Sequence, residues 1–172
     1  MAGPRCPICR TPHNRLGRVP PLAALKAAPR RLTAALRGVP RRFVARRPAR
    51  GEWAINEVLC HLADAEVALG FRIRKIASEP REAIPAFDQE RWADGGHYRR
   101  TSAAEALGTY TALRRSNLAY ATRLSAAQRR QYGRHPEYGR ISIAQLLEHW
   151  AEHDLNHLEQ VRKTHASLRS RT

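Results

Sequence analysis

A chain of 172 residues, of which 42% are hydrophobic, is long enough to form one buried core, and no run of about 18 apolar residues could span a membrane. Three cysteines are too few for a disulfide scaffold, and residues 1–15 lack the apolar segment of a signal peptide, so we expect a cytoplasmic protein. Residues 1–50 carry +13 of the net charge of +16, so we expect only weak, nonspecific nucleic-acid binding, through residues 1–50.

The chain is expected to begin with a disordered basic arm over residues 1–20, where Pro, Gly and Arg are frequent and no apolar period is visible. Within this arm, Cys6-Pro7-Ile8-Cys9 with His13 is similar to half of a zinc knuckle, but no second cysteine pair follows. We therefore expect one folded domain over residues 21–172, preceded by a flexible arm.

Four amphipathic helices are predicted in this domain. The first covers residues 21–37 and contains Pro29, and a basic linker over residues 41–51 separates it from the second, over residues 54–78. After an irregular stretch, the third helix starts at Thr101 or Ser102 and runs to residue 124. A turn over residues 125–132 and a loop over 135–139 precede the fourth helix, which follows Ser142 and runs to residue 168. No alternating strand pattern is visible, so the expected fold is all-α, a four-helix bundle.

Histidines recur at a spacing of four in the fourth helix, at positions 149, 153 and 157. Side chains at this spacing share one helical face, and two imidazoles so placed can bind one metal ion. On a helical wheel, His157 lies about 40° from the centre of the apolar stripe, His153 about 80° and His149 about 120°. We therefore predict that His153 and His157 face inward and that His149 is more exposed.

The second helix supplies a third candidate ligand. His61 lies about 80° from the centre of that helix's apolar stripe, a position suited to a ligand at the mouth of a bundle. Three neutral imidazoles leave a coordination position for water or a small-molecule substrate, as in catalytic zinc sites. A metal-bound water is easier to deprotonate, so we predict a divalent-metal enzyme site formed by His61, His153 and His157.

Three segments together resemble the DinB-like family: residues 53–66 around His61, residues 135–143 before the last helix, and residues 153–160 with both histidines and Gln160. The resemblance implies a four-helix bundle, a three-histidine site for zinc, nickel or a similar ion, and a homodimer. It also implies either a metal-dependent hydrolase or a transferase that uses a low-molecular-weight thiol such as bacillithiol or mycothiol. A non-catalytic metal-binding module, and a nucleic-acid-associated protein acting through the basic arm, are the alternatives.

Two carboxylates are candidate catalytic residues. Asp154 lies near the centre of the apolar stripe of the fourth helix, and Glu66 lies on the inner flank of the second. Either could orient a ligating imidazole or act as a general base, because a buried carboxylate needs a partner. The alternative is an ion pair with Arg72, Arg114 or Arg115. Cys60 is predicted to point away from both the apolar stripe and His61.

Overall fold

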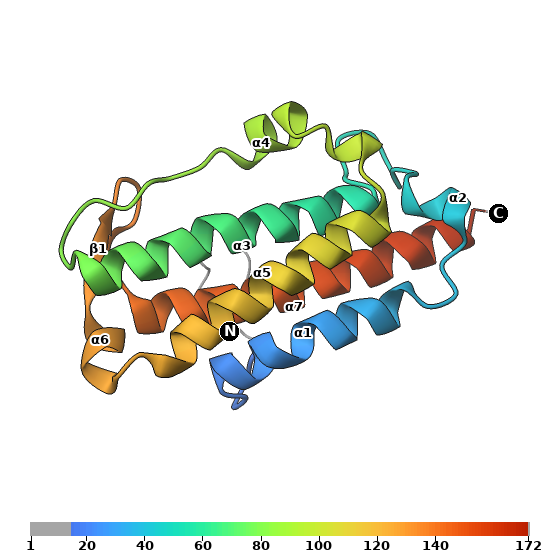
Figure 1. Ribbon diagram of the computed structural model, residues 1–172. Helices are drawn as coiled ribbons and strands as arrows, with labels where there is room; N and C mark the ends of the chain where they lie inside the picture. The colour runs from blue at the N-terminus through green and yellow to red at the C-terminus, as the bar shows by residue number, and fades with distance from the viewer. Residues whose placement is uncertain (1–14, 172) are drawn as a thin grey trace, which may run out of the picture.

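The computed structural model describes residues 15–171, so the Cys6, Cys9 and His13 motif lies outside the described residues. Four long helices lie side by side: α1 (Pro21–Leu36), α3 (Ile55–Ser78), α5 (Ala103–Arg123) and α7 (Ile143–Arg169) (Figure 1). Their bounds fall within two residues of the predicted ones, and the predicted four-helix bundle is confirmed. No helix between residues 15 and 171 is long and apolar enough to cross a membrane.

The helices follow one another around the bundle in the order α1, α7, α3, α5, because each contacts the two that flank it in this order. The connections from α1 to α3 and from α5 to α7 therefore join helices that are not neighbours. This arrangement makes α3 and α7 adjacent along their lengths. It is the contact that brings His61 beside the histidines of the last helix.

Two apolar clusters divide the bundle along its length. One contains the later turns of α3, residues 65–76, with the first turns of α7, including Trp150; the other contains the start of α3, residues 55–63, with Leu158 and Val161. Both α1 and α5 contribute residues to each cluster. Polar side chains are buried on the same helices, and they include His61, His153, Glu66 and Asp154, whereas His157 is half-buried.

Short helices replace segments that the sequence predicts to be irregular. The expected basic linker contains α2 (Arg41–Val44), which Phe43 anchors in the core. The irregular stretch before α5 contains α4 (Gln89–Gly95) and the 3₁₀ helix η1 (Tyr98–Arg100), and the expected turn after α5 contains α6 (Ala126–Arg130). Helices this short have no usable apolar period, so the sequence pattern does not reveal them.

The prediction that the chain contains no strand is wrong. The strands β1 (Tyr132–His135) and β2 (Gly139–Ser142) form an antiparallel hairpin in which Tyr132 pairs with Ser142 and His135 with Gly139. The strands are short and polar, and tertiary contacts stabilise them. A Cβ atom at Gly133 would lie 2.7 Å from the side chain of Ile84, so glycine allows the hairpin to pack closely against that residue. The hairpin positions His135 beside the bundle.

Candidate metal centre

The three predicted ligands converge. His61 projects from α3 and His153 and His157 project from α7, and one ligand atom of each lies within 4.8 Å of the others. The Nε2 atom of His153 lies 3.0 Å from Nε2 of His61 and 3.2 Å from Nε2 of His157. Among residues 15–171, no carboxylate and no thiol belongs to this group of candidate ligands. A spacing of four on α7 and the contact between α3 and α7 together create the cluster.

The protonation of these rings fits a cation. The Nδ1 atom of His157 lies 2.7 Å from the Gln160 amide oxygen, which only accepts, so the ring proton is on Nδ1 and the Nε2 lone pair faces the cluster. His153 Nε2 has a nitrogen on either side and can donate a proton to only one of them. At least one close pair of nitrogens therefore has no proton between them, and a divalent ion would satisfy such lone pairs.

Burial favours the neutral imidazoles that a metal ion needs. Burial lowers the pKa of His61 and of His153 well below the ordinary value, and the neighbouring His157 adds to the effect. Burial also lowers the pKa of His157, although Gln160 and Asp154 oppose the shift. The three rings are therefore ready to act as ligands at neutral pH, without a competing proton.

The predicted exposures of His149 and Cys60 are wrong. His149 was expected to be more exposed than His153 and His157 but is buried, with its ring centroid 5.9 Å from that of His153. Neighbouring elements cover this part of α7 on both flanks, since Ala151 and Glu152 are buried as well. Cys60 was expected to point away from the core but is buried beneath Tyr98, and burial raises the pKa of its thiol to about 11. A buried, protonated thiol is unreactive.

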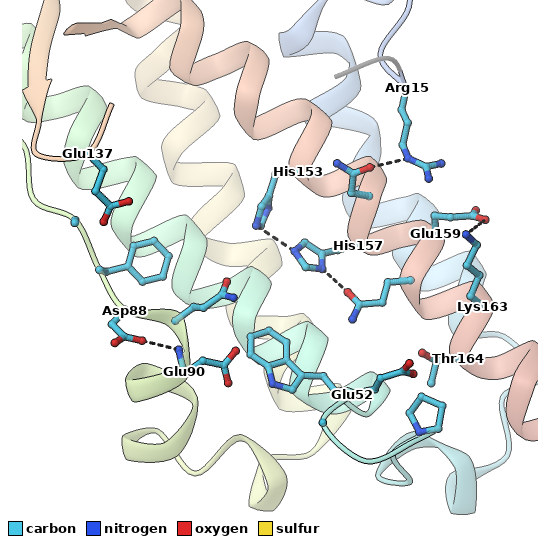
Figure 2. A pocket seen from close by; sticks show the side chains of 18 of the residues that line it. Arg15, Glu52, Asp88, Glu90, Glu137, His153, His157, Glu159, Lys163 and Thr164 are labelled. Carbon is cyan, nitrogen blue, oxygen red and sulfur yellow. Dashed lines mark hydrogen bonds and ion pairs between the residues drawn. The ribbon is translucent and has the colours of Figure 1, made fainter. Parts of the chain in front are cut away.

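An open cavity of about 1100 Å³ adjoins the three-histidine cluster. His153 and His157 lie side by side in its wall, and Glu137 and Glu90 lie across the cavity from them (Figure 2). Trp53 also lines the cavity, and its ring lies against His61 with 5.0 Å between centroids. The cavity leaves the histidine cluster accessible to small molecules, and the aromatic ring limits the positions that His61 can adopt.

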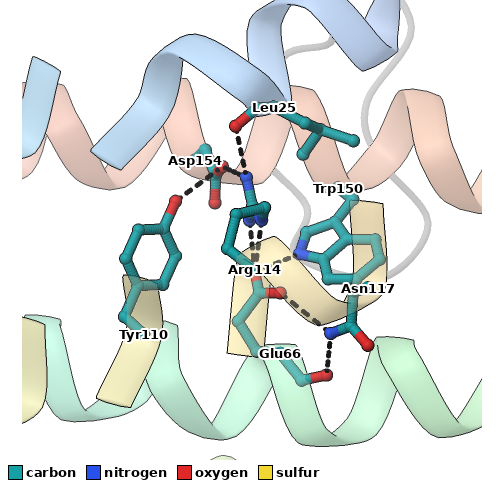
Figure 3. Close-up of polar contacts among 7 residues, drawn as sticks. All are labelled: Leu25, Glu66, Tyr110, Arg114, Asn117, Trp150 and Asp154. Carbon is teal, nitrogen blue, oxygen red and sulfur yellow. Dashed lines mark hydrogen bonds and ion pairs between the residues drawn. The ribbon is translucent and has the colours of Figure 1, made fainter. Parts of the chain in front are cut away.

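Asp154 and Glu66 belong to a buried polar network that joins α3, α5 and α7 (Figure 3). Arg114 of α5 donates to Asp154 Oδ2 at 2.5 Å and forms an ion pair with Glu66. The Tyr110 hydroxyl also donates to Asp154, and Trp150 donates to Glu66. Of the ion pairs considered in the sequence, the one with Arg114 is present. The roles of Asp154 and Glu66 in catalysis stay predictions, and their contacts favour positioning of α3, α5 and α7.

Two cavity residues were not recognised from the sequence as functional. His135 was noted only as part of a loop motif, and Arg72 only as a partner for the buried carboxylates. Both are buried and both line the cavity. Little in the sequence singles out either residue. His135 has no partner histidine at a helical spacing of four, and Arg72 is one of many arginines, the commonest charged residue in this chain.

Comparison with known proteins places this arrangement in context. The model of the DinB superfamily matches residues 24–161. Two proteins of Oceanobacillus iheyensis, both provisionally named metal-dependent hydrolases, are 27% identical over 111 residues and 30% identical over 115 residues. These alignments cover 64% and 65% of this chain and 64% of each relative, so the chain spans less than two thirds of the length of these proteins.

Solved structures with the same fold are also found. YfiT from Bacillus subtilis, given the same provisional activity and an unusual four-helix bundle topology, has a TM-score of 0.78 at 19% identity, over 84% of this chain and 83% of that one. TT2238, a four-helix bundle protein, has a TM-score of 0.62 at 20% identity, over 83% of this chain and 96% of that one. At these identities the likeness establishes the fold.

Proposed function

We propose that this chain, which belongs to the DinB superfamily, is a metal-dependent hydrolase whose divalent ion binds to His61, His153 and His157. The observation that carries the proposal is the convergence of three neutral imidazoles beside an open cavity, with no fourth ligand in the group among residues 15–171. Structural zinc sites have four protein ligands, whereas catalytic ones have three and keep one position open. The provisional names of the two Oceanobacillus relatives support the same class of reaction.

The chain's own residues would prepare this site before a substrate enters. Gln160 accepts the Nδ1–H of His157 and so keeps the Nε2 lone pair directed at the ion. Trp53 covers one side of His61 and helps to exclude water from it. The buried network of Arg114, Glu66 and Asp154 joins α3, α5 and α7, and so fixes the separation between His61 and the two histidines of α7. The ion would supply Lewis acidity, which makes water a stronger acid and a nucleophile near neutral pH.

Metal analysis combined with ester hydrolysis tests this proposal. Wild-type protein and His149→Ala, reconstituted with zinc, should hold about one ion per chain, as a single three-ligand site requires, and should hydrolyse p-nitrophenyl acetate. His153→Ala should lose both the ion and the hydrolysis, and chelation should abolish hydrolysis in wild-type protein. Hydrolysis that survives chelation, or that is equal in His153→Ala, would contradict the proposal. If the absorption spectrum of a cobalt-substituted sample did not change when azide was added, a non-catalytic metal-binding module would be favoured instead.

A further inference from the structure

Among the residues that the structure describes, two arginines are fully buried, and they differ in their partners. Arg114 is 1% exposed and contacts two carboxylates. Arg72 of α3 is 2% exposed, and among residues 15–171 no carboxylate lies within 4.0 Å of it. A buried guanidinium is costly to desolvate and is normally paired with an anion. Arg72 therefore lacks the counter-charge that its burial requires, and it lines the cavity of the metal centre.

The guanidinium of Arg72 is held in place. Its Nε and Nη2 atoms donate to the backbone carbonyl of Pro85 at 3.0 and 2.7 Å, and it lies over the ring of Phe87, 5.6 Å from the centroid. These neutral partners fix the orientation of the group without neutralising its charge. Nη2 also lies 3.3 Å from Nε2 of His135, which lines the same cavity.

Both atoms of the contact between Arg72 Nη2 and His135 Nε2 carry a proton, because of the tautomer of His135. The backbone N–H of Glu137 donates to Nδ1 of His135 at 3.3 Å, so the proton of the neutral ring is on Nε2. Burial and the charge of Arg72 both lower the pKa of His135, which keeps the ring neutral. Stacking on Tyr138, with 4.5 Å between centroids, fixes the plane of the ring. Two N–H donors thus meet at the cavity wall with no acceptor between them.

We propose that Arg72 and His135 bind an oxyanion of the substrate, from a carboxylate or phosphate group, while the bond to be broken lies at the three-histidine centre. An anionic oxygen can accept from both donors and supplies the counter-charge that Arg72 lacks. Burial lowers the pKa of Arg72, and Tyr138 and then Glu137 oppose the shift. Glu137, on the exposed turn of the hairpin, makes no ion pair with Arg72. The second half of the proposal rests on the proposed hydrolase function, whereas anion binding by Arg72 and His135 does not.

Matched probes of equal shape test the anion site. We would titrate the zinc-loaded protein with butyrate, with the neutral isostere butyramide and with inorganic phosphate, at constant ionic strength, following the His135 ring protons by NMR. Butyrate or phosphate should bind at least about tenfold more tightly than butyramide, as a charge-assisted hydrogen bond requires. Arg72→Gln should lose this preference, and Arg72→Lys should keep part of it. Arg115→Gln is the control, since it removes the same charge from an exposed site on α5.

The outcomes separate the two proposals. In His153→Ala, which should bind no metal, the preference for the anion should persist, so failure of the metal site would leave the anion site measurable. Loss of the preference in His153→Ala but not in Arg72→Gln would mean that the anion binds the metal, and would overturn the proposal. Equal binding of butyrate and butyramide to wild-type protein would overturn it as well. If Arg72→Gln unfolds, as judged by circular dichroism, His135→Phe provides the same test.

Discussion

Replacing Arg114 with methionine is expected to lower the free energy of unfolding by about 3–5 kcal/mol, the usual loss when one partner of a buried ion pair is removed. Arg114, Glu66 and Asp154 are each at most 3% exposed, so water cannot take the place of the guanidinium. Methionine fills similar space without charge and therefore leaves two uncompensated carboxylates in the core. Total stabilities are about 5–15 kcal/mol, so the loss should be easy to measure.

The contacts indicate which carboxylate accounts for most of the loss. Glu66 would still accept hydrogen bonds from Asn117 and Trp150, both at 3.0 Å. Asp154 would keep only the Tyr110 hydroxyl at 3.0 Å, and its second oxygen, Oδ1, has no hydrogen-bond partner among the described residues. Adding Asp154→Asn to Arg114→Met should therefore recover more stability than adding Glu66→Gln.

Urea unfolding followed by circular dichroism measures these differences. Arg115→Met is the matched control, because Arg115 is exposed on the same helix and its replacement should change stability by less than about 0.5 kcal/mol. If Arg114→Met destabilised the protein no more than Arg115→Met does, the buried network could not be holding the helices together. Equal recovery by the two second substitutions would refute the assignment of the loss to Asp154.

Of three further predictions, two concern the metal centre and one concerns the N-terminal cap of α3. His153→Ala should abolish metal binding and His149→Ala should preserve it, as measured by elemental analysis of folded protein; equal metal content would refute the ligand assignment. Gln160→Ala should weaken zinc affinity by about 10–100-fold in competition with a chelator, and an unchanged affinity would exclude its positioning role. Burial raises the pKa of Glu57, but the bonds from Arg47 and the Ala54 N–H outweigh this effect and lower it below 4.5. Its contribution to stability is therefore present above pH 4.5 and lost as the pH falls further, so the stability difference between wild-type protein and Glu57→Gln should shrink in acid; a difference independent of pH would contradict this.

Local features of the chain were predictable because their causes are local. Ser102 and Ser142 each accept the N–H three residues later and so begin α5 and α7 where the sequence places them. The spacing of four between His153 and His157 requires only a helix to place both side chains on one face. The position of His61 on the flank of its own apolar stripe was likewise readable, so all three ligand candidates were identified before the helices were assembled.

Exposure was harder to predict, because a helical wheel describes one helix and burial depends on its neighbours. His149 lies far from the apolar stripe of α7 and is nevertheless buried, since the bundle covers more of this helix than the stripe suggests. Cys60 is buried for a related reason: η1, which the sequence did not reveal, places Tyr98 above it. The wheel also ranked His157 as more inward than His153, whereas His153 is buried and His157 only half-buried.

The sequence by itself determined four helices, the serine caps of α5 and α7, and three histidines on inward-facing flanks, because hydrophobic period and capping act within a few residues. Only the tertiary structure decided which helices are neighbours, and therefore that His61 meets His153 and His157. It also decided that Arg114 pairs with Glu66 and Asp154, and that no carboxylate among residues 15–171 pairs with Arg72. Charge pairing between helices depends on distances of a few ångströms, and the packing of the two apolar clusters sets those distances.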